Sequence, residues 1–333
     1  MNPPFDVIII GQGLAGSLLA HALLKKNQNV LVIDDDHHSS SSIVAAGLIN
    51  PVTGFRPNVT EHFDTYLLSA QNMYGDLEKH FQGNFLFSYP QIRIYDSTEQ
   101  AQKWKEAQNT FVTDFVPATK QHPFGACLVT QSYVVNTTLI LQKTKEMLQI
   151  QNRLRHMKID YADIKLQKDA ILFQNFVAKK IVFCEGYKVL FNPFFSHLTM
   201  NPAKGELLTL QLNDLDPKIY NWGKWLVPKP NQTFILGSSF DRETLDERPT
   251  SKGKNDLLSA FKKVLPTQEV EILSHKAGVR PATLSRKPFV EAHPEHKNMY
   301  CFNGFGSKGC LMMPYYIEKL TSHIIDNTPM EVL

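Results

Sequence analysis

The chain is 333 residues long, which is enough for two domains or one large domain at roughly 100–200 residues per domain. Hydrophobic residues make up 43% of it and charged residues 20%, a balance that excludes global disorder and collagen-like or low-complexity character. Lysine and arginine number 35 against 32 acidic residues, so the formal net charge of +3 gives no support for nucleic-acid binding.

Cysteine spacing and hydropathy narrow the class further. No CxxC or zinc-ligand spacing joins the four cysteines, Cys127, Cys184, Cys301 and Cys310. His37 and His38 follow three aspartates, but adjacent side chains point apart, so we expect a solvated loop there and no metal site. The chain lacks a signal-peptide pattern and any stretch of about 20 apolar residues. These features predict a cytoplasmic protein without a membrane span.

The first residues predict a strand, a helix and a second strand in quick succession. Residues 5–10 form a β-branched apolar run, typical of a strand buried on both faces of a parallel sheet. Residues 17–26, rich in leucine and alanine, indicate a helix, and residues 29–33 indicate a second buried strand. This order is the beginning of a nucleotide-binding βαβ unit.

Three glycines in GxGxxG spacing lie between the first strand and the helix. Gly11 permits the tight turn, Gly13 lets the backbone approach a pyrophosphate, and Gly16 lets the helix pack close to the strand. The helix N-terminus offers free N–H groups to phosphates. Asp34, after the second strand, would accept hydrogen bonds from ribose hydroxyls and disfavours NADP. The turn predicts an adenine dinucleotide, FAD or NAD, bound by Gly11, Gly13, Leu14, Ala15, Gly16 and Asp34.

The segment after the second strand favours FAD. Residues 39–42 are consecutive serines, which we interpret as loop. Ala45, Ala46 and Gly47 follow, and such small residues suit a backbone that runs against a flat ring system. A fold that binds only NAD would usually continue directly into another helix and strand. We therefore expect these three residues to contact the cofactor.

At this point the chain resembles the D-amino acid oxidase superfamily of FAD-dependent oxidoreductases, which includes glycine oxidase, sarcosine oxidase and the oxidase half of a bacterial tRNA-modifying enzyme. The family's C-terminal signature is similar in order and spacing to this chain, although Ser285 or Arg286 stands where the family usually has Asp. The segments that carry the resemblance are residues 180–186, 202–207, 226–239, 278–283, 287–290 and 303–314.

The resemblance implies a role for Arg280. Because it lies between Gly278 and Pro281, it should end a strand or turn with a constrained backbone. A guanidinium held in this way can bind a carboxylate through two parallel hydrogen bonds, and the family uses an arginine here for the substrate carboxylate. The alternative is a structural arginine that pairs with an aspartate or a helix C-terminus.

A second glycine turn precedes a predicted helix at residues 310–325. In the family it faces the pyrimidine end of the flavin, where N–H groups, a helix dipole and Lys308 would stabilise negative charge. Lys308 as a merely solvated side chain remains the alternative, and we expect Cys310 to be buried and inert. The resemblance implies that the cofactor is also bound by Gly186, Gly304, Gly306, Ser307, Lys308 and Gly309.

The expected fold class is α/β: a Rossmann-like FAD-binding domain with a central parallel sheet, and a second, antiparallel-sheet substrate domain. We assign residues 1–58, 126–200 and 274–333 to the first domain. Residues 59–125 and 201–273 form the second, because residues 205–240 alternate in short runs broken by Asn, Asp, Pro and Gly.

The sequence therefore predicts an FAD-dependent oxidase or dehydrogenase of a carboxylate-bearing amine, with Arg280 and Lys308 as catalytic residues. Hydride would pass to flavin N5, the imine would hydrolyse, and oxygen or another acceptor would reoxidise the flavin. Three alternatives remain open: a tRNA-modifying oxidase acting on a carboxymethylaminomethyl group, a non-catalytic FAD binder, and an NAD-linked dehydrogenase. We expect no membrane partner, and tRNA is not the favoured substrate.

Overall fold

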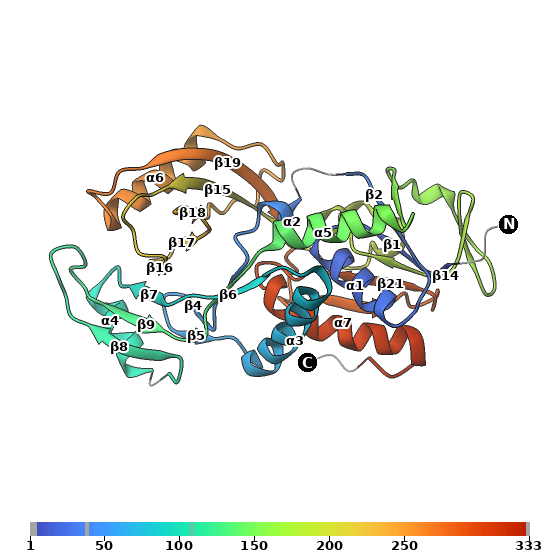
Figure 1. The fold of residues 1–333 in the computed structure, drawn as a ribbon, viewed down its shortest axis with the longest axis horizontal. Helices are drawn as coiled ribbons and strands as arrows, with labels where there is room; N and C mark the ends of the chain where they lie inside the picture. Colours follow the sequence, from blue (N-terminus) through green and yellow to red (C-terminus); the bar gives the residue numbers. More distant parts are fainter. Residues whose placement is uncertain (1–4, 37–39, 108, 331–333) are drawn as a thin grey trace.

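A computed structural model describes residues 5–36, 40–107 and 109–330 (Figure 1). His37, His38 and Ser39, for which we expect loop, lie outside the described residues. The described chain forms two lobes, each built on a sheet. The lobe with both chain ends carries α1, α3, α5 and α7, and the other lobe carries α4 and α6 (Figure 1).

The centre of the first sheet is parallel. In spatial order its parallel strands are β11 (Leu154–His156), β2 (Val30–Asp34), β1 (Phe5–Ile10), β14 (Phe176–Phe183) and β21 (Met299–Asn303). Antiparallel strands flank them: β20 (Phe289–Ala292) beside β21, and β13 (Ile171–Phe173) with β12 (Ile164–Leu166) beside β14. The central strands β1 and β2 are almost wholly buried, as their apolar runs predict, because cores form on both faces of the sheet.

Helices cover one face of this sheet. They are α1 (Leu14–Lys25), α3 (Phe63–Phe81), α5 (Thr137–Ile150) and α7 (Gly309–Asp326). Helix α7 packs against both α1 and α3, and the hydroxyl of Tyr74 on α3 donates to the carbonyl of Cys310 on α7 at 2.8 Å. Helix α3 falls in the segment that we predict for the substrate domain, and the domain boundaries stay a prediction.

The second sheet is largely antiparallel, in agreement with the predicted fold class. Its spatial order is β19 (Glu271–Arg280), β15 (Ala203–Gln211), β18 (Thr233–Gly237), β17 (Trp225–Pro228), β16 (Ile219–Asn221), β7 (Gln91–Ile94), β9 (Ala126–Val129) and β8 (Val112–Val116). Only β16 and β7 pair in parallel within this order. Helix α6 (Ser251–Val264) packs on this sheet through Leu257 and Phe261, and α4 (Thr98–Glu106) follows β7.

The remaining elements are short. They are α2 (Ser41–Val44), β3 (Leu48–Ile49), β4 (Val52–Thr53), β5 (Asn58–Val59), β6 (Leu86–Ser88), β10 (Tyr133–Val135) and the 3-10 helices η1 (Tyr161–Asp163), η2 (Gly186–Phe191) and η3 (Pro193–Phe195). The loop prediction for residues 39–42 is wrong for Ser41 and Ser42, which begin α2. The predicted helix at residues 17–26 also begins earlier, at Leu14.

The described part of the chain bears on the expectations about membrane spans, cysteines and metal sites. Among the described residues, no helix is long and apolar enough to cross a membrane. The four cysteines are all buried and unpaired. No group of three His, Cys, Asp or Glu side chains in the described part of the chain is arranged to hold a metal ion.

Candidate functional site

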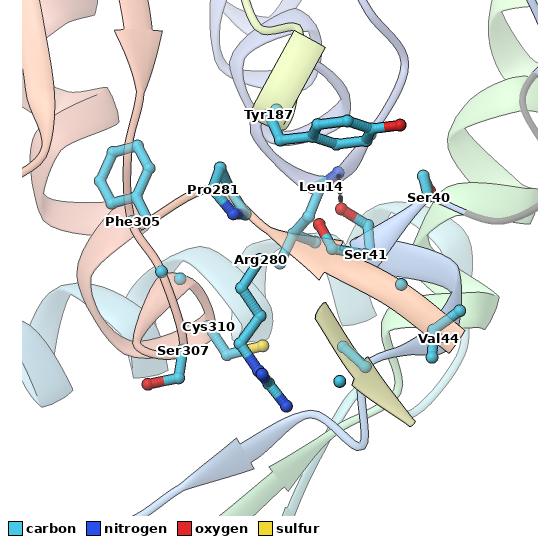
Figure 2. Close-up of a pocket in the computed structure, with 18 of the residues that line it drawn as sticks. Leu14, Ser40, Ser41, Val44, Tyr187, Arg280, Pro281, Phe305, Ser307 and Cys310 are labelled. Carbon is cyan, nitrogen blue, oxygen red and sulfur yellow. Dashed lines mark hydrogen bonds between the residues drawn. The ribbon is translucent and has the colours of Figure 1, made fainter. Parts of the chain in front are cut away.

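A cavity of about 1040 Å³ is lined by residues from both sheets. Its lining includes Gly11, Gly13, Leu14, Asp34 and Tyr161 from the first lobe and Arg93 and Asn221 from the second sheet. Figure 2 shows part of this cavity, where Arg280 leaves the end of β19 near Ser307 and Cys310. The volume is at the upper end of the range for small-molecule sites, which suits an extended ligand.

The first glycine turn brings the N-terminus of α1 to the cavity. Gly11 has a φ of 100°, which favours glycine, and a Cβ on Gly16 would lie 1.9 Å from the carbonyl oxygen of Gly11. Gly16 therefore lets the helix contact the turn and does not itself line the cavity. Gly13, Leu14 and Ala15 do line it. A Cβ on Gly13 would meet only the hydroxyl of Ser42, at 3.3 Å.

Asp34 lines the cavity at the end of β2 and also braces the turn. Its Oδ2 accepts a hydrogen bond from the backbone N–H of Gln12 at 2.6 Å, and its Oδ1 accepts one from the N–H of Asp36 at 2.8 Å. Each carboxylate oxygen has two lone pairs, so both retain capacity for ligand hydroxyls. The position fits the predicted contact with ribose.

The segment at Ala45, Ala46 and Gly47 also lines the cavity. A Cβ on Gly47 would lie 1.9 Å from the carbonyl oxygen of Val135, because the backbone N–H of Val135 bonds to the Gly47 carbonyl at 2.8 Å. The ammonium of Lys229 donates to the Ala46 carbonyl at 3.0 Å from the second sheet, and burial lowers the pKa of this lysine to about 8. Contacts from both lobes thus fix the segment.

The second glycine turn brings the N-terminus of α7 to the same cavity. Gly306, Ser307, Lys308, Gly309 and Cys310 line it, whereas Gly304 is absent from the lining (Figure 2). Gly304 has a φ of 82° and packs beside Thr283, so its role is in the turn. Burial raises the pKa of the Cys310 thiol to about 12, in keeping with the expected inert cysteine.

Gly186 lines the cavity after β14, as the resemblance implies. Its φ is 60°, nothing lies within 4 Å of the place where a Cβ would stand, and its carbonyl accepts a bond from the Asn303 amide at 2.7 Å. Glu185 beside it also lines the cavity. Burial raises the pKa of Glu185 to about 7, although hydrogen bonds from Tyr161 and Asn192 pull it back towards its ordinary value.

Arg280 ends β19, as its place before Pro281 predicts. Its guanidinium lies over Gly205, where a Cβ would stand 1.9 Å from Nη2. Nη2 donates to the Ser238 hydroxyl at 2.6 Å and to the Ser239 carbonyl at 3.3 Å. Among the described residues no carboxylate lies within ion-pair distance of it, and burial lowers the pKa of the guanidinium.

With this geometry in place, the sequence can be compared with known proteins. A sequence profile described as FAD dependent oxidoreductase, DAO, matches residues 6–321. The chain belongs to the DAO family. Its members are FAD-dependent enzymes, so the predictions of FAD and of an oxidoreductase are confirmed, and the NAD-linked alternative and the non-catalytic binder are set aside.

Relatives of the DAO enzyme share its fold over almost the whole chain. This chain is 22% identical over 348 residues to a glycine oxidase of Bacillus subtilis (strain 168), and the alignment covers 94% of this chain and 91% of that protein. The crystal structure of iminodiacetate oxidase from Chelativorans sp. BNC1 superposes with a TM-score of 0.81 at 17% identity, covering 98% and 97% of the two chains.

A longer relative is the tRNA 5-methylaminomethyl-2-thiouridine biosynthesis bifunctional protein MnmC of Leptospira borgpetersenii serovar Hardjo-bovis (strain JB197). The identity is 24% over 375 residues, covering 95% of this chain and 57% of that protein. The DAO chain therefore spans little more than half of this bifunctional relative.

The cavity of this DAO enzyme fits a bound FAD. At Gly13 and Gly186 a side chain would project into open or nearly open space at the cavity wall, so glycine leaves room for a ligand next to the backbone. Two helix N-termini, at Leu14 and Gly309, face the same cavity. These are the donors and the close backbone approaches that a diphosphate and a flavin ring require.

Several residues at the cavity were missed by sequence reasoning. The hydroxyl oxygen of Ser42 accepts a hydrogen bond from the Leu14 N–H at 3.0 Å. It was missed because it is the last of the four consecutive serines that were predicted to be loop. Glu185 and Lys229 fall within segments that carry the resemblance, but neither was singled out. Arg93 carried no signal, because it lies on a strand whose partner strands the sequence does not reveal.

Proposed function

We propose that this DAO enzyme oxidises an amine that carries a carboxylate, and that Arg280 binds that carboxylate. The observation that carries the proposal is a partly buried guanidinium in the cavity wall with only neutral oxygen partners among the described residues. A buried cation without an ion-pair partner is costly, and an anionic ligand removes that cost.

The contacts of Arg280 orient it for this role. The Ser238 hydroxyl and the Ser239 and Lys204 carbonyls hold the guanidinium from one side, at 2.6, 3.3 and 3.4 Å. Five N–H donors are available on the group, so further donors remain for a ligand. A planar guanidinium fixed in this way can bind a carboxylate by two parallel hydrogen bonds, which orients the carbon next to the amine.

Other residues would hold the cofactor and receive developing charge. We assign the ADP half to the turn at Gly11 and Gly13 and to Asp34, and the flavin half to residues 45–47 and 306–309. Bound FAD supplies a hydride acceptor for oxidation of the amine to an imine, which water then hydrolyses. The N-terminus of α7 and the Lys308 ammonium would stabilise negative charge at this end of the cavity.

The named relatives support a substrate of this class. Glycine and iminodiacetate, in the names of the two similar oxidases, are both amines with a carboxylate. The proposal holds whether oxygen or another molecule accepts the electrons from the reduced flavin.

The deciding experiment is anaerobic titration of the FAD-loaded protein with glycine, N-methylglycine, proline and D-amino acids. We expect one of them to bleach the flavin absorbance. Arg280→Met should retain FAD while kcat/KM falls about 100- to 1,000-fold, because a buried charge-assisted pair is worth roughly 2–5 kcal/mol. Unchanged kcat/KM in that variant would contradict the assigned role, and Arg280→Lys should recover part of the loss.

A second candidate is oxidation of a carboxymethylaminomethyl group on tRNA, which the MnmC relative favours. The same carboxylate-binding arginine would serve it. Flavin that resists every small amine but bleaches with tRNA, together with a mobility shift of the tRNA, would identify this substrate. The near-balanced charge of the chain offers no concentrated basic surface in its support.

A further inference from the structure

A second arginine, Arg93, lines the same cavity. It lies on β7, paired with Asn221 on β16, which in turn pairs with Trp225 on β17. Directly paired residues project from the same face of a sheet, and all three line the cavity. Arg93 is therefore held by the second, largely antiparallel sheet.

The partners of Arg93 leave its charge uncompensated. Its side chain is buried, with a relative exposure of 4%. Nη1 donates to the side-chain oxygen of Asn221, Nη2 makes a long bond of 3.4 Å to the Gly54 carbonyl, and Nε has no partner. Within the described chain no carboxylate lies within ion-pair distance of it.

The nearby groups do not account for a buried cation here. Asp96 acts on Arg93 only over a longer distance and is solvent-exposed, so water and salt screen it. The Trp104 ring lies 5.2 Å from the guanidinium carbon and contributes a cation–π contact, which favours the charged form. Both features keep Arg93 charged and neither replaces a direct anionic partner.

The strands that carry the hydrogen-bond partners of the two arginines are close enough together to suit a small ligand. Arg93 contacts the side chain of Asn221 on β16, and Arg280 contacts Ser238, which follows β18. These strands are two apart in the sheet, or about 10 Å at 4.7–4.9 Å per strand. A small diacid spans such a gap with one hydrogen bond at each end.

We infer that Arg93 forms a second oxyanion subsite, so that the substrate is an amine with two acidic groups, one bound by Arg280 and the other by Arg93. The inference rests on the proposed function, since it adds a second acidic group to the carboxylate-bearing amine proposed above. The second group is a carboxylate or a phosphate, because a guanidinium binds both in the same way.

The test is anaerobic titration of the FAD-loaded protein with two matched pairs of ligands, read as apparent Kd from the flavin spectrum. N-carboxymethylglycine against N-methylglycine reports a second carboxylate, and O-phosphoserine against serine reports a phosphate. We expect the diacid of one pair to bind about 10- to 100-fold more tightly, which is the contribution of hydrogen bonds to a charged group.

Arg93→Met should abolish this preference while the Kd of the monoacid stays within about twofold. The matched control is Arg155→Met, since Arg155 lies 5.6 Å over the Phe176 ring and does not line the cavity. If Arg93→Met does not fold, Arg93→Lys serves instead and should retain only part of the preference, because an ammonium lacks the planar fork.

The outcomes separate the two proposals. Equal binding within both pairs in the wild type, or a preference that survives Arg93→Met, would overturn the subsite while leaving the proposed function in place. Failure of every ligand to perturb the flavin would overturn both. A preference that is lost in Arg93→Met and kept in Arg155→Met would establish the subsite.

Discussion

Two glycine turns face the same cavity, and their differences show how one architecture serves two tasks. Each follows a buried parallel strand, β1 or β21, and each leads into a long helix. The first turn is braced by an acid, since Asp34 accepts from its backbone. The second carries a cation, Lys308, at the N-cap of α7. The acid of the first turn therefore suits a neutral ribose, and the cation of the second suits a place where negative charge develops.

The two turns should differ most in how tightly the helix that follows each turn is packed. In Gly16→Ala the new Cβ would lie 1.9 Å from a backbone oxygen, whereas in Gly309→Ala the nearest atom is the flexible end of Met313 at 2.8 Å. We expect Gly16→Ala to destabilise the fold by more than about 3 kcal/mol and to lose FAD. Gly309→Ala should change stability by less than about 1 kcal/mol.

Chemical denaturation and FAD content of the two variants measure this difference. Equal losses would show that the second turn is packed as tightly as the first. A stable Gly16→Ala variant with bound FAD would contradict the close approach of α1 to its turn.

A smaller effect should separate binding from catalysis. Asp34→Asn keeps one acceptor oxygen but loses the charge, so we expect FAD to bind about 10-fold more weakly while kcat of the FAD-saturated enzyme is unchanged. Lys308→Met should do the reverse, with kcat about 10-fold lower and FAD affinity within about threefold. Equilibrium titration with FAD and steady-state kinetics at saturating FAD measure the two effects, and identical behaviour of the two variants would contradict the division of tasks.

The smallest predicted effect is a pH-dependent change in stability at Glu185. Its pKa is about 7 in the folded protein because burial disfavours the carboxylate, and it is near 4.3 in the unfolded chain. Between these values the unfolded state releases the proton that the folded state keeps, so stability falls as pH rises from about 4.3 to 7. Glu185→Gln removes this loss, and the Tyr161 hydroxyl is placed to bond the new amide.

Thermal unfolding of Glu185→Gln should therefore show a Tm about 2–4 °C above that of the wild type at pH 8 and close to it at pH 4.5. Glu269→Gln, at an exposed loop position, is the matched control and should show no such pH dependence. A Tm difference that does not vary with pH would contradict the raised pKa of Glu185.

Local patterns predicted one lobe well. The runs at residues 5–10 and 29–33 became β1 and β2 because every side chain in a central parallel strand is buried, so no polar alternation interrupts the pattern. The spacing of Gly11 and Gly16 identified the turn because its contacts are local. The start of α1 at Leu14 was missed, since Gly16 lies inside the helix despite its low helix propensity.

The other lobe depends on contacts that are distant in sequence. Helix α6 was not predicted, and Gly253 in its first turn is explained only by Glu206, whose carboxylate would lie 2.5 Å from a Cβ there. Arg93 is polar within a short strand, and its place at the cavity depends on β16, more than a hundred residues later. The roles of Arg280 and Lys308 came from resemblance and stay proposals.

The cavity is built from chain segments that are far apart in sequence, and this has a consequence for the stability of the protein in the cell. A molecule that touches residues 11–14, 45–47, 278–281 and 306–310 at once binds only the folded chain. Its binding free energy therefore adds to the free energy of unfolding, and about 100-fold excess over Kd contributes about 2.7 kcal/mol. The amount of intact protein in a cell should follow the supply of riboflavin, from which FAD is made.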